Sequence, residues 1–261
     1  MIDVIIEHKK SKLELSHPEQ FNELNPLQFR ALIRYFIIPE VPLVERLSDS
    51  IALLQFFLGQ ELNKSIKTRW YRVMNSMVED GILADLLKLQ NFIYEEQTFN
   101  NWILKEIKAG SRTFYGPRDR FSYMTFGEFI SADMMFLNYF EQKTDAMLNR
   151  FIATLYKDNL KEEFSTDLIA SRASQIEKLD NIDKQGILFN YSSVRYWLTD
   201  KYPFVFKGSE QNKQEIHLGN NNQAGWMSIR RNLAGDVLNL DKIDRVLLHD
   251  VLADLNEKMS K

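Results

Sequence analysis

The chain has 261 residues, of which 44% are hydrophobic and 12% aromatic, so it carries enough apolar material for a sizeable buried core. Its net charge of −3 argues against a protein whose whole surface binds nucleic acid, because such a surface is basic throughout. A local basic patch is still compatible with this charge. Cysteine is absent, which excludes disulfides, thiolate nucleophiles and cysteine-ligated zinc.

No segment of the sequence reads as a leader or a membrane span. The first residues, MIDVIIEHKK, hold only a short apolar run before a charged one, and a signal peptide needs roughly 7–15 apolar residues. No window approaches the ~18 apolar residues of a membrane-spanning helix. We therefore expect a cytoplasmic protein without a membrane partner. The low numbers of glycine (10) and proline (6) favour long helices.

The N-terminal third is predicted to begin with a hairpin and to continue as helices. Residues 2–7 and 12–16 resemble two short strands. Asn25 followed by Pro26 is typical of a helix start, because asparagine caps the first amides and proline suits the first helical position. Further helices are predicted over 42–58, with Gly59 at the end, and on both sides of Gly81.

The middle of the chain is predicted to be irregular up to Thr125 and helical after it. Residues 96–123 show no clear period and contain Gly110 and the pair Gly116-Pro117. Thr125 and Glu128 have the spacing of a capping box, in which each side chain bonds the backbone amide of the other residue. The aromatic residues that follow at helical spacing predict a stripe that faces the core. They are Phe129, Phe136 and Phe140.

The C-terminal half is predicted to hold three more helices, a polar loop and a final helical element. The three helices start near Asp145, at Ser165 and near residue 183, and the last of them ends at Pro203. Residues 207–224 are the most polar stretch. The prediction is a mainly α, multi-helix single domain with a small N-terminal β-hairpin. Its parts are an entry segment (1–24), a helical core (25–206), the polar loop (207–224) and a C-terminal helical element (225–261).

The sequence contains no recognisable catalytic or metal-binding motif. Its four histidines form no HExxH or other close pair, and there is no phosphate-binding glycine loop and no GxSxG. Neighbouring carboxylates on a helix point about 100° apart, so pairs such as Glu162-Glu163 do not converge on one substrate. We predict no catalytic residues, no metal and no cofactor. An enzyme of unrecognised type stays open as an alternative.

A basic stretch with interleaved aromatic residues is the first candidate binding site. Cations that follow phosphates and rings that stack on bases together make a surface for single-stranded nucleic acid. The competing interpretation is an ordinary exposed loop whose aromatic residues point inward, since Glu106 and Asp119 dilute the charge. The cations are Lys105, Lys108, Arg112, Arg118 and Arg120, and the rings are Phe114, Tyr115 and Phe121.

The C-terminal end is the second candidate. A helix predicted from Asp241 onward carries an apolar stripe that could dock in a groove of a neighbouring subunit. The simpler interpretation is that this helix packs on its own domain. The candidate docking residues are Ile243, Leu247, Val251 and Leu255.

Several blocks of the sequence, in order, resemble proteins encoded in the tail-gene regions of phages and prophages of the Bacteroidetes. The blocks are HPEQFNELNPLQF, MTFGEFISAD, FIATLYK, GILFNYSSVRYWLTDKYPFVF and GWMSIRRNLAGD, and the resemblance spans roughly residues 17–255. The chain departs from that pattern after Leu155-Tyr156, where Lys157-Asp158 stands in place of Arg-Pro.

The resemblance implies a role in virion morphogenesis and brings no catalytic residue with it. The protein would be a tail assembly chaperone or a small structural component that works by protein–protein contact. Its partners would be other virion proteins, with a second copy of the chain as a further candidate, and its location the host cytoplasm or the virion. Binding of nucleic acid through the basic stretch is the rival interpretation.

Overall fold

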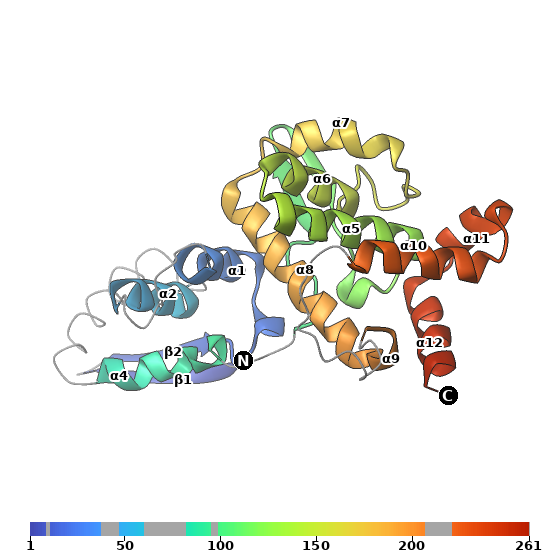
Figure 1. The fold of residues 1–261 in the computed structure, drawn as a ribbon. Coiled ribbons are helices and arrows are strands. Elements are labelled where there is room, and N and C mark those ends of the chain that lie inside the picture. The colour runs from blue at the N-terminus through green and yellow to red at the C-terminus, as the bar shows by residue number, and fades with distance from the viewer. Residues whose placement is uncertain (9–10, 38–46, 60–81, 95–98, 207–220, 261) are drawn as a thin grey trace. The chain divides into compact units, whose positions relative to one another are not determined.

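The computed structural model describes residues 1–8, 11–37, 47–59, 82–94, 99–206 and 221–260 (Figure 1). Contacts divide the chain into two compact units, Met1–Phe99 and Asn100–Lys261, a boundary that the sequence analysis did not predict. Helices dominate the described residues, and the named strands among them form only two antiparallel hairpins. The predicted mainly α class with an N-terminal hairpin is confirmed.

The N-terminal unit combines the predicted hairpin with short helices. β1 and β2 pair with Val4 opposite Leu15, and the Asn25 side chain caps α1 by accepting from the amides of Leu27 (3.0 Å) and Gln28 (2.9 Å). Its described elements are β1 (Ile2–His8), β2 (Ser11–His17), the 3₁₀ turn η1 (Phe21–Glu23), α1 (Pro26–Leu32), the π-helical turn η2 (Ile33–Ile37), α2 (Leu47–Gly59), α4 (Ile82–Leu87) and the 3₁₀ helix η4 (Lys88–Ile93).

Two groups of side chains form the core of this unit. Leu15 of β2 packs with Leu54 and Leu58 of α2 and Leu86 of α4. A set of aromatic rings lies beside η1, α1, α2 and η4, and consists of Phe21, Phe29, Phe57, Phe92 and Phe99. The predicted start of the second helix at 42–46, and most of the helix before Gly81, lie outside the described residues.

The C-terminal unit holds a hairpin, a stack of helices and the C-terminal helices. Its described elements are β3 (Glu106–Ala109), β4 (Arg112–Tyr115), the 3₁₀ turn η5 (Asp119–Phe121), α5 (Phe126–Gln142), α6 (Asp145–Leu155), α7 (Asp167–Ile176), α8 (Asn181–Lys201), α9 (Pro203–Phe206), α10 (Asn221–Ala234), the 3₁₀ turn η6 (Val237–Asn239), α11 (Leu240–Asp244) and α12 (Leu248–Met259). The polar loop predicted at 207–224 lies outside the described residues up to 220, and Asn221 already belongs to α10.

The second hairpin falls where the sequence analysis expected irregular structure. β3 and β4 pair with Ile107 opposite Phe114, and both of these side chains are buried. Gly110 sits in the turn with φ +64°, a conformation that glycine adopts without steric cost. Each of these strands has only four residues. The alternation of polar and apolar residues is therefore too short to be recognised as a strand in the sequence.

In Figure 1 the helices α5, α6 and α7 stack one over the next, and α8 runs across them. The ring of Tyr191 on α8 lies 4.9 Å from that of Phe136 on α5 and 5.0 Å from that of Phe151 on α6, measured between centroids. The predicted aromatic stripe therefore faces the core at Phe129 and Phe136, whereas Phe140 is 39% exposed near the end of α5.

A buried carboxylate joins three of these helices. Asp133 of α5 is fully buried and accepts from Arg195 Nε (2.6 Å) and the Tyr191 hydroxyl (3.2 Å), both on α8, and from Trp226 Nε1 of α10 (2.9 Å). Burial, and then the charge of Asp133, raise the pKa of the Tyr191 phenol, which keeps it a hydrogen-bond donor. The bonds to Asp133 thus connect α5 with α8 and α10.

The predicted helix from Asp241 onward is two helices with a break between them. The Val246 carbonyl accepts from the Phe126 amide (2.8 Å), and the Leu248 amide donates to the Met124 carbonyl (2.9 Å). These bonds to the start of α5 take the place of helical bonds, so α11 ends at Asp244 and α12 begins at Leu248. A contact between residues more than a hundred positions apart thus overrides the local helical pattern.

Candidate functional site

A hollow on the C-terminal unit lies where the basic and aromatic stretch meets the loop after α6. It consists of an inner cavity of about 80 Å³ and an adjoining outer one of about 450 Å³. The residues that line both are Tyr115, Gly116, Pro117, Arg118, Tyr123 and Leu160. The complete wall is formed by Lys105, Glu106, Tyr115, Gly116, Pro117, Arg118, Asp119, Ser122, Tyr123, Met124, Glu128, Leu155, Lys157 and Leu160.

The wall after β4 is fixed by close packing onto two buried rings. A Cβ at Gly116 would lie 2.7 Å from Trp102 Nε1 and 2.7 Å from Tyr156 Cε1, so only glycine fits. Trp102 donates to the Tyr156 hydroxyl (3.1 Å), which donates to the Leu104 carbonyl (2.6 Å). Both rings are fully buried, so this wall rests on a rigid base.

The opposite wall is joined to β4 by a pair of backbone hydrogen bonds. The Tyr115 amide donates to the Lys157 carbonyl (2.8 Å), and the Lys157 amide donates to the Tyr115 carbonyl (2.9 Å). This antiparallel bridge brings the end of α6 beside β4. It therefore places the Lys157 side chain in the inner cavity, which Glu128 also lines.

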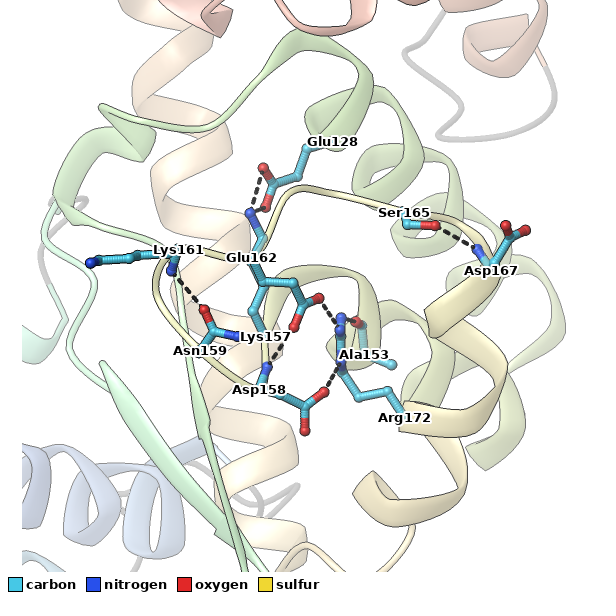
Figure 2. Close-up of polar contacts among 10 residues, drawn as sticks. All are labelled: Glu128, Ala153, Lys157, Asp158, Asn159, Lys161, Glu162, Ser165, Asp167 and Arg172. Carbon is cyan, nitrogen blue, oxygen red and sulfur yellow. Dashed lines mark hydrogen bonds and ion pairs between the residues drawn. The ribbon is translucent and has the colours of Figure 1, made fainter.

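Two of the residues that line the inner cavity form an ion pair. Lys157 Nζ lies 3.1 Å and 3.2 Å from the two carboxylate oxygens of Glu128, as Figure 2 shows. Burial raises the pKa of Glu128, although the charge of Lys157 acts in the opposite direction. Thr125 caps α5 as predicted, accepting from the Glu128 amide (3.3 Å), while the Glu128 carboxylate is directed to Lys157.

The loop between α6 and α7 is anchored by Arg172, which is buried on α7. Its guanidinium donates to the Ala153 carbonyl (2.9 Å), pairs with Asp158 (3.4 Å) and binds Glu162 (Figure 2). Glu162 in turn accepts from the Asp158 amide (3.1 Å). The loop is therefore held on both sides of Leu160, which lines the hollow with 67% of its surface exposed.

The turn at η5, beside the outer cavity, is held in an unusual backbone conformation. Arg120 has φ +60° and Phe121 φ +53°, which residues with a Cβ rarely adopt. His249 of α12 bonds the Arg120 carbonyl (2.6 Å) through Nε2 and the Tyr202 hydroxyl (2.8 Å) through Nδ1. Because a carbonyl only accepts, Nε2 carries the proton, and Nδ1 of the neutral ring accepts from Tyr202. Burial lowers the pKa of His249, which favours this neutral form.

The structure separates the residues predicted to bind nucleic acid. Lys105 and Arg118 line the hollow, whereas Lys108 and Arg112 lie on the hairpin strands and Arg120 donates to the Asn100 side chain (3.3 Å). All five cations are exposed, and Lys105 is paired with Asp119 (3.0 Å). The rings of Phe114 and Phe121 are buried in the core, so they offer no surface to a base.

Two of the four predicted docking residues are buried within their own unit. Val251 and Leu255 are 7% and 9% exposed, on the face of α12 that also buries Leu248 and Leu252. Ile243 of α11 is half-buried, and Leu247, in the break between α11 and α12, is 40% exposed. The four residues do not form one continuous stripe, because the break separates the first two from the others.

Sequence reasoning missed the parts of the hollow that come from outside the basic stretch. In the sequence, Glu128 has the position of a capping residue, and Lys157 is only a departure from the tail-region pattern. Tyr123 and Leu160 carried no signal in the sequence beyond their types. Their meeting depends on how α5, α6 and the hairpin pack, which no local pattern reports.

Comparisons with protein-family models, with curated proteins and with solved structures found no match for this chain. Within the part of the chain that the structure describes, no group of three or more acidic or histidine side chains is placed to hold a metal ion. In the same residues, no helix combines the length and apolar character needed to cross a membrane.

Proposed function

We propose that the protein is a non-enzymatic component of phage-type tail assembly or structure, and that it acts by contact with other proteins. The sequence blocks that resemble tail-region proteins supply the biological setting. The observation that carries the mode of action is the charge of the hollow. Its wall has three cations, Lys105, Arg118 and Lys157, and three anions, Glu106, Asp119 and Glu128.

A charge-balanced wall suits a protein partner better than a polyanion. Binding of nucleic acid depends on lysines and arginines that replace the counterions of successive phosphates. Here Lys105 and Lys157 are already occupied by Asp119 and Glu128, which would repel a phosphate at the same place. A peptide segment of mixed charge meets no such repulsion, and protein interfaces commonly combine aromatic residues, arginine and a polar rim.

Nucleic-acid binding is the second candidate, and one feature favours it. Arg118 lies over the ring of Tyr123, 4.2 Å from its centroid, and Tyr123 is 65% exposed. An exposed ring beside a guanidinium can stack a base and contact its phosphate. This pair is the strongest support for the rival function.

Two parallel measurements separate the candidates. Tagged wild-type protein and the charge reversal Arg112→Glu/Arg118→Glu/Arg120→Glu are used to capture partners from phage-producing cells, with mass spectrometry of the bound proteins. The same two proteins are titrated into fluorescent oligo(dT) at low salt. We expect the wild type to capture virion proteins and to bind oligo(dT) no better than the triple variant.

A matched charge reversal controls for the change in net charge. Lys143, Lys178 and Arg231 are exposed and lie outside the hollow, so Lys143→Glu/Lys178→Glu/Arg231→Glu alters the charge equally. If this control still binds oligo(dT) and the Arg112/Arg118/Arg120 variant does not, the result would support nucleic-acid binding instead of the proposed function. Capture of no virion protein by the wild type would also contradict the proposal.

A further inference from the structure

We propose that the hollow binds a peptide segment that carries a large apolar side chain next to one carboxylate. This inference rests on the proposed function, because it names the kind of partner segment that the protein would contact. It follows from the apolar wall, from the contacts that hold the wall in place and from Arg118, which forms no ion pair among the described residues.

The wall leaves two large apolar side chains in water. Leu160 is 67% and Tyr123 65% exposed, and both line the inner and the outer cavity. Tyr115 and Pro117 extend the same surface. The outer cavity of about 450 Å³ is within the range of roughly 300–1,000 Å³ typical of ligand sites, so a Phe-sized side chain and its backbone fit.

The wall is held in place before any ligand arrives. Arg172 anchors the loop that carries Leu160, and the Tyr115–Lys157 bridge fixes its distance from β4. On the other side, the Trp102–Tyr156 pair supports Gly116. A preformed site loses little conformational freedom on binding, so more of the contact energy appears as affinity.

One cation of the wall remains to recognise a charged ligand. Lys105 is bonded to Asp119 and Lys157 to Glu128, whereas Arg118 forms no ion pair among the described residues. The contact with Tyr123 orients its guanidinium beside the apolar surface. A carboxylate next to the inserted side chain can accept hydrogen bonds from the guanidinium of Arg118. Glu106, which also lines the hollow, repels any further negative charge. The wall therefore selects one carboxylate and not a run of phosphates.

The test uses defined peptides and the isotope-labelled full-length chain. N-acetylated, C-amidated hexapeptides with Phe-Asp at the centre are titrated in NMR experiments, beside the same peptides with Phe-Asn, Phe-Lys or Ala-Asp, and beside oligo(dT). We expect Phe-Asp to shift the amide signals of Tyr115, Arg118, Tyr123 and Leu160. Phe-Lys and Ala-Asp should bind at least threefold more weakly, and oligo(dT) should not compete.

Two single substitutions assign the binding to the wall. Arg118→Gln should weaken Phe-Asp about three- to fivefold, as expected for an exposed ion pair, and leave Phe-Asn unchanged. Leu160→Ala should weaken both peptides. Arg112→Gln, exposed on β4 but outside the hollow, is the matched control and should change neither.

The inference is overturned if millimolar Phe-Asp leaves these amide signals unmoved, if Phe-Lys binds equally well, or if oligo(dT) binds at these residues more tightly than the peptide. Its failure is distinct from that of the proposed function. Virion proteins captured equally by wild type and Arg118→Gln, with no peptide binding at the hollow, would contradict only the site. Peptide binding without any captured virion protein would contradict only the tail-assembly role.

Discussion

Gly116 shows how a single residue determines the shape of the hollow. Its Cα approaches Trp102 and Tyr156 so closely that a methyl group would lie 2.7 Å from each ring, and both rings are fully buried and bonded to each other. Neither ring can move without losing the hydrogen bond between them or the one to the Leu104 carbonyl.

Gly116→Ala should therefore lower the free energy of unfolding of the C-terminal unit by about 1–3 kcal/mol, the usual cost of overpacking. Urea unfolding followed by tryptophan fluorescence measures it. Gly225→Ala on α10 is the control, because a Cβ there meets no atom within 4 Å and alanine favours a helix. A Gly116→Ala variant as stable as the wild type would show that the wall is soft.

His17 is a buried ring in the N-terminal unit with an unusual protonation balance. It packs edge-on against Phe57 and Phe92, and neither ring nitrogen has a hydrogen-bond partner among the described residues. Burial lowers its pKa from 6.5 to about 4. The folded chain thus holds His17 neutral at pH values where the unfolded chain protonates it.

The sign of the resulting pH dependence follows from that lowered pKa. Above about pH 6.5 His17 is unprotonated in both the folded and the unfolded state, and its full contribution to the free energy of unfolding is present. As the pH falls from 6.5 towards 4, the unfolded state gains the proton, and the free energy of unfolding decreases by up to about 3 kcal/mol. His17→Leu should remove this part of the acid sensitivity. Urea unfolding at pH 7.5 and pH 5 measures it, and equal losses in wild type and variant would contradict it.

At the scale of elements, the C-terminal helices are integrated into their unit. Leu248 and Leu252 of α12 are fully buried, and Trp226 of α10 is buried and bonded to Asp133. The start of α5 is bonded to the backbone between α11 and α12. These contacts favour the interpretation that the C-terminal element packs on its own unit over the docking interpretation.

Deletion of residues 226–261 should consequently unfold the C-terminal unit or lower its melting temperature sharply. Each large apolar side chain removed from the core contributes roughly 1.5–3 kcal/mol, and the total stability of a domain is about 5–15 kcal/mol. Circular dichroism melting is the readout, with deletion of residues 259–261 alone as the control, since Met259 is 53% exposed. An unchanged melting temperature after the long deletion would restore the docking-arm interpretation.

At the scale of the whole molecule, the chain comprises two compact units that meet in sequence at Phe99 and Asn100. The two cores differ in character. The N-terminal unit is built from leucines and a group of aromatic rings, whereas the C-terminal unit adds the buried Asp133 network and the Glu128–Lys157 pair. The candidate site belongs to the C-terminal unit alone.

The sequence by itself determined the mainly α class, the first hairpin and several helix starts. These depend on interactions between residues a few positions apart, such as Asn25 with Gln28 and Thr125 with Glu128. Only the tertiary structure decided the hollow, because its wall joins Tyr115, Glu128 and Leu160 through the packing of β4, α5 and the loop after α6. The tertiary structure also decided the break before α12. There, backbone bonds to Met124 and Phe126 replace helical bonds, because distant partners can lower the free energy of the chain more than local ones.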